Sequence, residues 1–312
     1  MEQPTATVSP LLRRMADDMR MRNFKPKTRH RLGALALREQ AMLLGITSPG
    51  PEMRMNKQAT LITGASSGIG LALATTFASH GHPVILLARS VAALNKLAEE
   101  LRKKHAVSAE VIVADLQLPD ASERVAEELA ARGLNVEILV NNAGFGLIGP
   151  FAALDLQRQI DSIQVNVTAL THLTRLFLPR MLERNDGGVL NVASTAAFQA
   201  GPNGAVYYAT KAFVLSLTEA LHEEVSATGV HVSCLCPGPT NTGFLAANDI
   251  SDGINLFRFG AQSSEAVAKV GYRALQRNQA IAISGFKNSL LATTAKFSPR
   301  FVTRRIAMAL NS

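Results

Sequence analysis

The sequence has 312 residues, 47% of them hydrophobic and 18% charged, which is enough to build one large globular domain with an appendage. Its net charge of +8 is concentrated at the two ends, because residues 1–57 carry +6, residues 285–312 carry +5 and residues 58–284 carry −3. The negative charge of residues 58–284 argues against a basic surface for nucleic acid or membrane on the body of the chain. With only two cysteines, the chain has neither a disulfide framework nor enough thiol ligands for a cysteine-based metal site.

The first segment with a recognisable pattern is residues 9–49, which we predict to form two helices. Ser9 followed by Pro10 signals the start of the first helix, Thr28 caps the second, and Gly45 ends it. The N-terminus lacks the apolar core of a signal peptide, and no apolar run of about 18 residues is found anywhere. We therefore expect a cytoplasmic protein.

From about Ala59 onwards, short apolar runs alternate with longer segments of helical periodicity. Continuous apolar runs of this length are typical of parallel strands that are covered on both faces. The helices between them make βαβ units with right-handed crossovers. We predict an α/β fold, a single domain built on a doubly wound Rossmann-type parallel sheet of seven strands: TLIT (60–63), PVILLA (83–88), AEVIVAD (109–115), VEILVNN (136–142), GVLNVAS (188–194), VHVSCLCP (230–237) and QAIAIS (279–284).

The first predicted strand runs into a turn with Gly64, Gly68 and Gly70, a G-x-x-x-G-x-G spacing. Such a turn lets the backbone approach a pyrophosphate at a helix N-terminus, although glycine-rich turns also occur simply to pack a helix on a strand. The second strand ends in Ala88 and Arg89, where an acid would favour NAD. A guanidinium suits the 2′-phosphate of NADP, and a solvated surface arginine is the alternative.

Two adjacent tyrosines, Tyr207 and Tyr208, precede Lys211 by four and three residues. On a helix both spacings place the side chains on one face, and a neighbouring ammonium favours the phenolate. Spacing alone therefore does not choose between the tyrosines. An amphipathic helix with ordinary core tyrosines is the alternative to a catalytic pair.

Together these motifs resemble those of the short-chain dehydrogenase/reductase family. The resemblance covers roughly Met55 to the end, and implies an NADP-dependent oxidoreductase that acts on a carbonyl or secondary alcohol. A catalytically silent NADP-sensing or scaffold protein is the alternative, against which the complete catalytic set argues. The motifs are TGASSGIG (63–70), NNAG (141–144), Asn166, Ser194 placed 13 positions before Tyr207, Lys211, and CPGPTNTGF (236–244).

The resemblance assigns catalytic roles to Asn166, Ser194, Tyr207 and Lys211. Tyr207, four residues before the lysine, is expected to protonate the carbonyl oxygen, or to act as the base in the reverse direction. Lys211 and the oxidised nicotinamide are expected to lower its pKa. Ser194 would donate a hydrogen bond to the same oxygen, and Asn166 would hold a water that links Lys211 to solvent. Tyr208 becomes a wall or core residue.

The resemblance also implies a cofactor site. Asp115 ends the third strand where the family hydrogen-bonds adenine, with a helix N-cap as the alternative, and Asn141 is expected to tie strands together. The expected cofactor residues are Gly64, Ser66, Ser67, Gly68, Ile69, Gly70, Arg89, Asp115, Leu116, Asn142, Ala143, Gly144, Tyr207, Lys211, Pro237, Gly238, Thr240 and Thr242.

Apolar side chains dominate the loops that are expected at the carboxyl edge of the sheet, where Arg258 is the obvious anion partner. Such walls favour a hydrophobic ketone or alcohol, steroid-like or acyl-chain-like, over a phosphorylated sugar. The apolar residues are Phe145, Leu147, Ile148, Phe198, Phe244, Leu245, Ile254, Leu256, Phe257 and Phe259.

The two ends receive separate interpretations. Residues 9–49 resemble the start of the helical N-terminal DNA-binding domain of phage-integrase-type tyrosine recombinases. Either they are a fused remnant with weak phosphate affinity, or they are upstream sequence ahead of an ordinary reductase start at Met55; we expect no function for them and no nucleic-acid partner.

The tail is apolar and basic. We expect it to cover the domain or to form a dimer contact, with peripheral membrane contact as the less favoured alternative. We expect the chain to assemble as a homodimer or homotetramer. The expected division is therefore a basic helical extension over 1–54, a catalytic domain over 55–285 and a helical tail over 286–312.

Overall fold

A computed structural model of the chain describes residues 57–241 and 261–310, and the account that follows concerns those residues. The chain divides between Met55 and Asn56 into two units, and every described residue belongs to the second unit. Two groups of predictions lie outside the described residues: the helices expected over 9–49, and Thr242, Phe244, Leu245, Ile254, Leu256, Phe257, Arg258 and Phe259.

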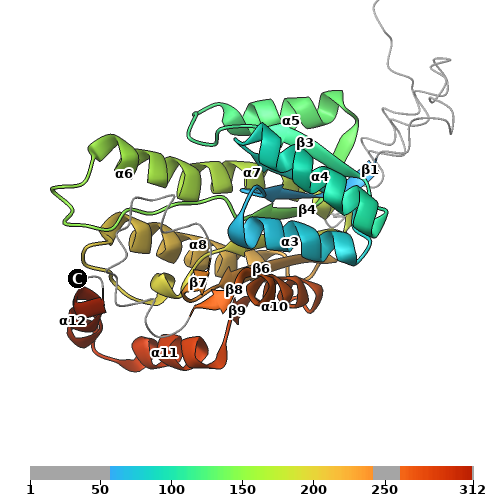
Figure 1. Ribbon diagram of the computed structural model, residues 1–312. Helices are drawn as coiled ribbons and strands as arrows, with labels where there is room; N and C mark the ends of the chain where they lie inside the picture. The colour runs from blue at the N-terminus through green and yellow to red at the C-terminus, as the bar shows by residue number, and fades with distance from the viewer. Residues whose placement is uncertain (1–56, 242–260, 311–312) are drawn as a thin grey trace, which may run out of the picture. The chain divides into compact units, whose positions relative to one another are not determined.

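A seven-stranded sheet with the order β3-β2-β1-β4-β5-β6-β9 forms the centre of this unit, and every neighbouring pair is parallel (Figure 1). All seven strands overlap the predicted segments, so the predicted fold class is confirmed. The strands are β1 (Lys57–Thr63), β2 (Val84–Ala88), β3 (Ala109–Val113), β4 (Leu134–Asn141), β5 (Gly187–Val192), β6 (Val230–Cys236) and β9 (Ile281–Ile283).

A small additional sheet was not predicted. In it β7 (Thr240–Asn241) pairs in parallel with β8 (Gln262–Ser263). Two residues are too short to show the alternation that identifies a strand in a sequence.

Helices cover both faces of the large sheet, as doubly wound connections require (Figure 1). In chain order they are α3 (Gly68–Ser79), α4 (Val91–His105), α5 (Ala121–Ala131), α6 (Leu156–Ile163), the π-helical turn η1 (Gln164–Ala169), α7 (Leu170–Arg184), the 3-10 helix η2 (Thr195–Phe198), α8 (Ala205–Glu224), α10 (Ser264–Gln276), α11 (Phe286–Phe297) and α12 (Arg300–Leu310). In the described part of the chain, none of them is long and apolar enough to cross a bilayer.

Successive residues of the central strands belong to different hydrophobic cores. Ile62 packs in one core with side chains of α3, α4 and α10, whereas its neighbour Leu61 packs in another with side chains of α5 and α7. Both are fully buried. Because successive side chains of a strand point to opposite faces, this burial explains why the strands are apolar throughout instead of alternating.

A chain of buried polar side chains crosses the middle of the sheet. The Asn141 amide on β4 donates to Thr174 Oγ1 at 3.0 Å and to Asn191 Oδ1 on β5 at 2.9 Å. The Asn191 amide in turn donates to Thr218 Oγ1 on α8 at 3.0 Å. We name these four residues the amide chain. It confirms that Asn141 ties strands together, and it links α7 to α8 through two strands.

Candidate active site

The turn between β1 and α3 is built so that the backbone can bend tightly. Gly64 and Gly68 have positive φ angles of 66° and 53°, a region that L side chains rarely adopt. A Cβ at Gly70 would lie 2.1 Å from the Gly64 carbonyl oxygen. Any side chain at Gly70 would therefore force the turn open, so this spacing of glycines has a steric reason.

The end of β4 holds this turn in place. The Asn142 amide donates to the Thr63 carbonyl at 2.9 Å, and the backbone N–H groups of Asn142 and Ala143 donate to Thr63 Oγ1 at 3.0 and 2.9 Å. The predicted NNAG motif therefore has two functions in the fold. Its first asparagine belongs to the amide chain, and its second supports the glycine turn.

Asn166 lies in the π-helical turn η1, where the helix between α6 and α7 departs from regular geometry. Its amide nitrogen donates to the Phe145 carbonyl at 2.8 Å and to Thr210 Oγ1 at 3.0 Å, and its Oδ1 accepts from the Phe145 N–H at 3.0 Å. The side chain is 1% exposed. It therefore fixes the backbone at Phe145, and the water relay stays a prediction.

The two tyrosines on α8 occupy different surroundings. The Tyr207 ring lies so close to Gly146 that a Cβ there would come within 2.4 Å of Tyr207 Cδ2. Tyr208 is buried, and a Cβ at Gly201 would come within 2.2 Å of Tyr208 Cδ2. The Lys211 ammonium lies 5.8 Å from the centre of the Tyr207 ring and donates to the Val192 carbonyl at 2.9 Å. The lysine therefore lies beside Tyr207.

Ser194 follows β5 and caps η2. Its Oγ accepts from the Ala196 N–H at 3.1 Å and lies 3.4 Å from the Pro237 carbonyl, to which it donates. Ser194 lies close enough to Tyr207 to lower the pKa of its phenol. Both side chains line the same cavity.

Burial dominates the electrostatics of this cluster. It raises the pKa of Tyr207 to about 12, against a smaller lowering by Ser194. It also lowers the pKa of Lys211 to about 8. Among the chain's own groups, desolvation of the phenolate outweighs the favourable interactions. The lowering expected from Lys211 together with the oxidised nicotinamide stays a prediction.

Arg89 and Asp115 lie together at the ends of β2 and β3. Arg89 Nη1 is 3.9 Å from Asp115 Oδ2, and the arginine side chain is 68% exposed. Asp115 accepts from the Gln117 N–H at 3.0 Å, so it closes a short turn, whereas α5 has Asp120 as its N-cap. The alternative that Asp115 caps that helix is therefore wrong.

A cavity of about 1300 Å³ joins these groups at the carboxyl ends of the strands. Three of the four predicted catalytic residues line it (Ser194, Tyr207 and Lys211), whereas Asn166 does not line it and lies against Gly144. Every described residue of the predicted cofactor set also lines it: Gly64, Ser66, Ser67, Gly68, Ile69, Gly70, Arg89, Asp115, Leu116, Asn142, Ala143, Gly144, Tyr207, Lys211, Pro237, Gly238 and Thr240.

The predicted substrate wall agrees less well with this cavity. Phe145 and Ile148 line it, but Leu147 is a buried core residue and Phe198 packs against the core around α8. The contribution of α11 and α12 was not predicted, although a face of small or polar side chains recurs at Asn288, Ala292 and Ala295. The tail residues that line the cavity are Lys287, Asn288, Leu291, Ala292, Thr294, Ala295, Ser298, Thr303 and Ile306.

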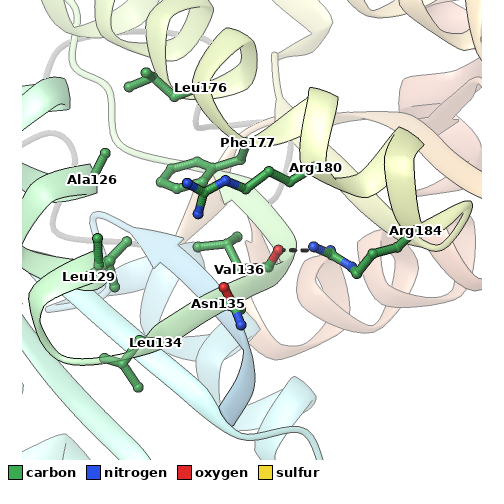
Figure 2. A pocket seen from close by; sticks show the side chains of 10 residues that line it. Ala126, Leu129, Leu134, Asn135, Val136, Leu176, Phe177, Arg180 and Arg184 are labelled. Atoms are coloured by element: carbon green, nitrogen blue, oxygen red, sulfur yellow. Dashed lines mark hydrogen bonds between the residues drawn. The ribbon is translucent and has the colours of Figure 1, made fainter. Parts of the chain in front are cut away.

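A second cavity of about 100 Å³ lies between α5, the start of β4 and α7 (Figure 2). Arg184 reaches over it and donates from Nη2 to the Val136 carbonyl at 3.2 Å, with Arg180 one helical turn earlier. This cavity lies where β4 begins, whereas the large cavity lies where the strands end. It is therefore separate from the candidate active site.

Comparison with known proteins gives consistent matches. A family model described as short chain dehydrogenase matches residues 58–251. The very-long-chain 3-oxoacyl-CoA reductase of Bos taurus is 34% identical over 181 residues, which are 57% of this chain and 57% of the relative.

Three solved structures share the fold over most of this chain. A short-chain dehydrogenase from Sphingobium yanoikuyae in complex with NADPH has a TM-score of 0.67 and 30% identity, covering 77% of this chain and 94% of its own. A 7β-hydroxysteroid dehydrogenase has a TM-score of 0.72 and 26% identity, covering 80% and 96%. A short chain dehydrogenase/reductase from Burkholderia phymatum in complex with NAD has a TM-score of 0.67 and 26% identity, covering 76% and 92%.

Proposed function

Since this chain belongs to the short-chain dehydrogenase family, and is therefore a nicotinamide-dependent oxidoreductase, we propose that it transfers hydride between NADP(H) and a hydrophobic ketone or secondary alcohol. One observation carries the proposal. Ser194 and Tyr207 line the same cavity as the glycine turn after β1. A reacting carbonyl and a dinucleotide would thus share one space.

In the proposed reduction, Tyr207 gives its proton to the carbonyl oxygen and Ser194 donates a hydrogen bond to that oxygen. Two converging donors stabilise the negative charge that develops there. With a pKa of about 8, Lys211 can lose and regain a proton near neutral pH, which suits it to resupply the tyrosine. When bound, the nicotinamide supplies or accepts the hydride, and its positive oxidised form favours the phenolate.

The glycine turn fits a dinucleotide. Side chains are sterically excluded at Gly64 and Gly70, and the turn leads into the N-terminus of α3, where backbone N–H groups favour a pyrophosphate. Arg89 supports NADP over NAD, because its exposed guanidinium lies at the end of β2 and would neutralise a 2′-phosphate. Asp115 beside it would receive the adenosine.

The substrate class is inferred from the walls of the cavity. Ile148, Tyr208, Leu291 and Ile306 offer apolar or aromatic surface in the cavity that would also hold the dinucleotide. Apolar walls of this kind support a lipophilic ketone, steroid-like or acyl-chain-like. The names of the bovine acyl-CoA relative and the hydroxysteroid structure point the same way.

The test measures the loss of NADPH absorbance with a steroid ketone, a long-chain 3-keto ester and a phosphorylated ketose. We expect turnover of a bulky ketone, lowered at least about a hundredfold by Tyr207→Phe, because a general acid contributes about 10²–10⁴-fold. Tyr208→Phe keeps the ring against Gly201 and is the matched control, expected to retain most activity.

Different failures would refute different parts of the proposal. Reduction of the phosphorylated ketose alone would refute the substrate class. Equal loss in the two tyrosine variants would refute the assignment of the acid.

Three further expectations accompany this proposal: a cytoplasmic location, a homodimer or homotetramer, and a catalytic domain over 55–285 followed by a tail over 286–312. Light scattering of the purified chain tests the assembly. We propose no role for residues 1–54.

A further inference from the structure

The two C-terminal helices expose large apolar side chains. On α11, Phe286, Leu290 and Phe297 are 84%, 55% and 85% exposed, and on α12, Phe301 and Met308 are 53% and 46% exposed. We name these five residues the tail face. Single exposed apolar residues are ordinary, but several on two consecutive helices mark an interaction site.

Helical spacing places each set on one side of its helix. Phe286, Leu290 and Phe297 stand at i, i+4 and i+11, and Phe301 and Met308 stand at i and i+7. Ala292 and Ala307, on other sides of the same helices, are 4% and 0% exposed. On each helix a small residue is therefore buried while the largest apolar side chains are exposed.

Basic side chains flank the tail face. Arg300, Arg304 and Arg305 are all exposed, and the last two fall on either side of Phe301 and Met308 around α12. Residues 285–312 contain five Lys or Arg and no Asp or Glu. An apolar stripe between arginines is typical of helices that lie in the surface of a bilayer, where the long basic side chains reach the headgroups.

We propose that the tail face binds the surface of an anionic lipid bilayer. A second copy of the chain is the main competing occupant, but a two-fold contact through this face would bring its arginines against the same arginines, with no acid in the tail to pair them. An anionic bilayer supplies both the apolar layer and the negative charge. The exposure of the tail face thus reverses the preference drawn from the sequence.

Leu291 and Ile306 of the same helices, which are 66% and 55% exposed, line the large cavity. A chain bound through the tail face would hold this wall of the cavity next to the bilayer, where a lipophilic ketone dissolves. This consequence rests on the proposed function, whereas the bilayer contact does not.

The test is sedimentation of the full chain with vesicles of phosphatidylcholine alone and of equal parts phosphatidylcholine and phosphatidylglycerol. We expect binding to the anionic vesicles that weakens with added salt. Phe297→Ser with Phe301→Ser should lower the partition coefficient at least about tenfold, because it removes two large apolar contacts. Phe151→Ser is the matched control, since Phe151 is 63% exposed and lies outside the tail.

A second pair of variants isolates the charge. Arg304→Gln with Arg305→Gln should weaken binding about thirtyfold, because each basic side chain near an anionic surface is worth about 1 kcal/mol and about 1.4 kcal/mol is tenfold. Lys103→Gln with Lys104→Gln, on the exposed side of α4, should leave it unchanged. NADPH binding and melting temperature verify that each variant folds.

Several results would overturn the proposal. These are equal sedimentation with neutral and anionic vesicles, no sedimentation at all, and equal loss of binding in the Phe151 control. Light scattering can give a fourth refuting result: the wild type is an oligomer that does not bind vesicles, and the Phe297/Phe301 variant dissociates. Because sedimentation needs no turnover, these outcomes are distinct from a failure of the proposed reaction.

Discussion

Replacing Lys211 by Met should stabilise the fold while it abolishes turnover. Burial lowers the pKa of Lys211 from 10.5 to about 8, which corresponds to about 3 kcal/mol spent on keeping the ammonium charged at neutral pH. Methionine fills a similar volume without a charge. The Val192 carbonyl loses its 2.9 Å hydrogen bond, at about 1–3 kcal/mol. The net expectation is a gain in the free energy of unfolding of about 1 kcal/mol.

The stability difference between Lys211→Met and the wild type should depend on pH. The folded pKa lies below the unfolded one, so between pH 8 and 10.5 the unfolded chain binds more protons and wild-type stability rises with pH. Above that window both states are neutral and the cost is gone. The advantage of Lys211→Met should therefore be full near pH 7 and should shrink as the pH rises toward 10.5.

Urea unfolding at several pH values measures this difference, with NADPH turnover measured in parallel. Lys104→Met, on the exposed side of α4, is the matched control and should change neither quantity. A variant destabilised by more than about 1 kcal/mol at pH 7 would refute the reasoning, because it would mean that the ammonium is stabilised by more than its bond to Val192.

Three other predictions address the cofactor and the extension. Arg89→Ala should weaken NADPH binding by about 1–3 kcal/mol in a fluorescence titration and leave NADH unchanged, and equal losses would make Arg89 structural. Gly70→Ala should weaken both nucleotides, because its Cβ would lie 2.1 Å from the Gly64 carbonyl oxygen; unchanged binding would show that the turn adapts. A chain starting at Met55 should keep NADPH turnover and a melting temperature within a few degrees, and an insoluble product would contradict this.

The strands could be predicted because strands that are buried on both faces have continuous apolar sequences, such as PVILLA (83–88). The identity of the acid could not be predicted in this way, since positions three and four before Lys211 share a helical face. The family resemblance chose Tyr207, and the structure adds a physical distinction, because the lysine lies beside the Tyr207 ring while Tyr208 is buried against Gly201.

Other features depend on distant packing and left weak signals in the sequence. The raised pKa of Tyr207 follows from how deeply the folded chain buries it, which no local motif encodes. The contribution of α11 and α12 to the cavity depends on where the tail docks, and its small inward residues resemble those of any amphipathic helix. The π-helical turn at η1 is a local departure from regular periodicity, which a helical pattern does not reveal.

The amide chain has a consequence for how the sheet assembles. Asn141 and Asn191 stand directly opposite each other on β4 and β5, strands that the chain joins through a long helical crossover. If the two strands slipped by one residue, Asn141 would stand opposite Leu190 or Val192 and lose its bond to Asn191, at about 1–3 kcal/mol for a buried group left without a partner. Parallel strands of high sequence separation form late and are prone to mispairing. The pair of asparagines thus favours the correct register of β4 and β5, because a sheet with these strands shifted is less stable.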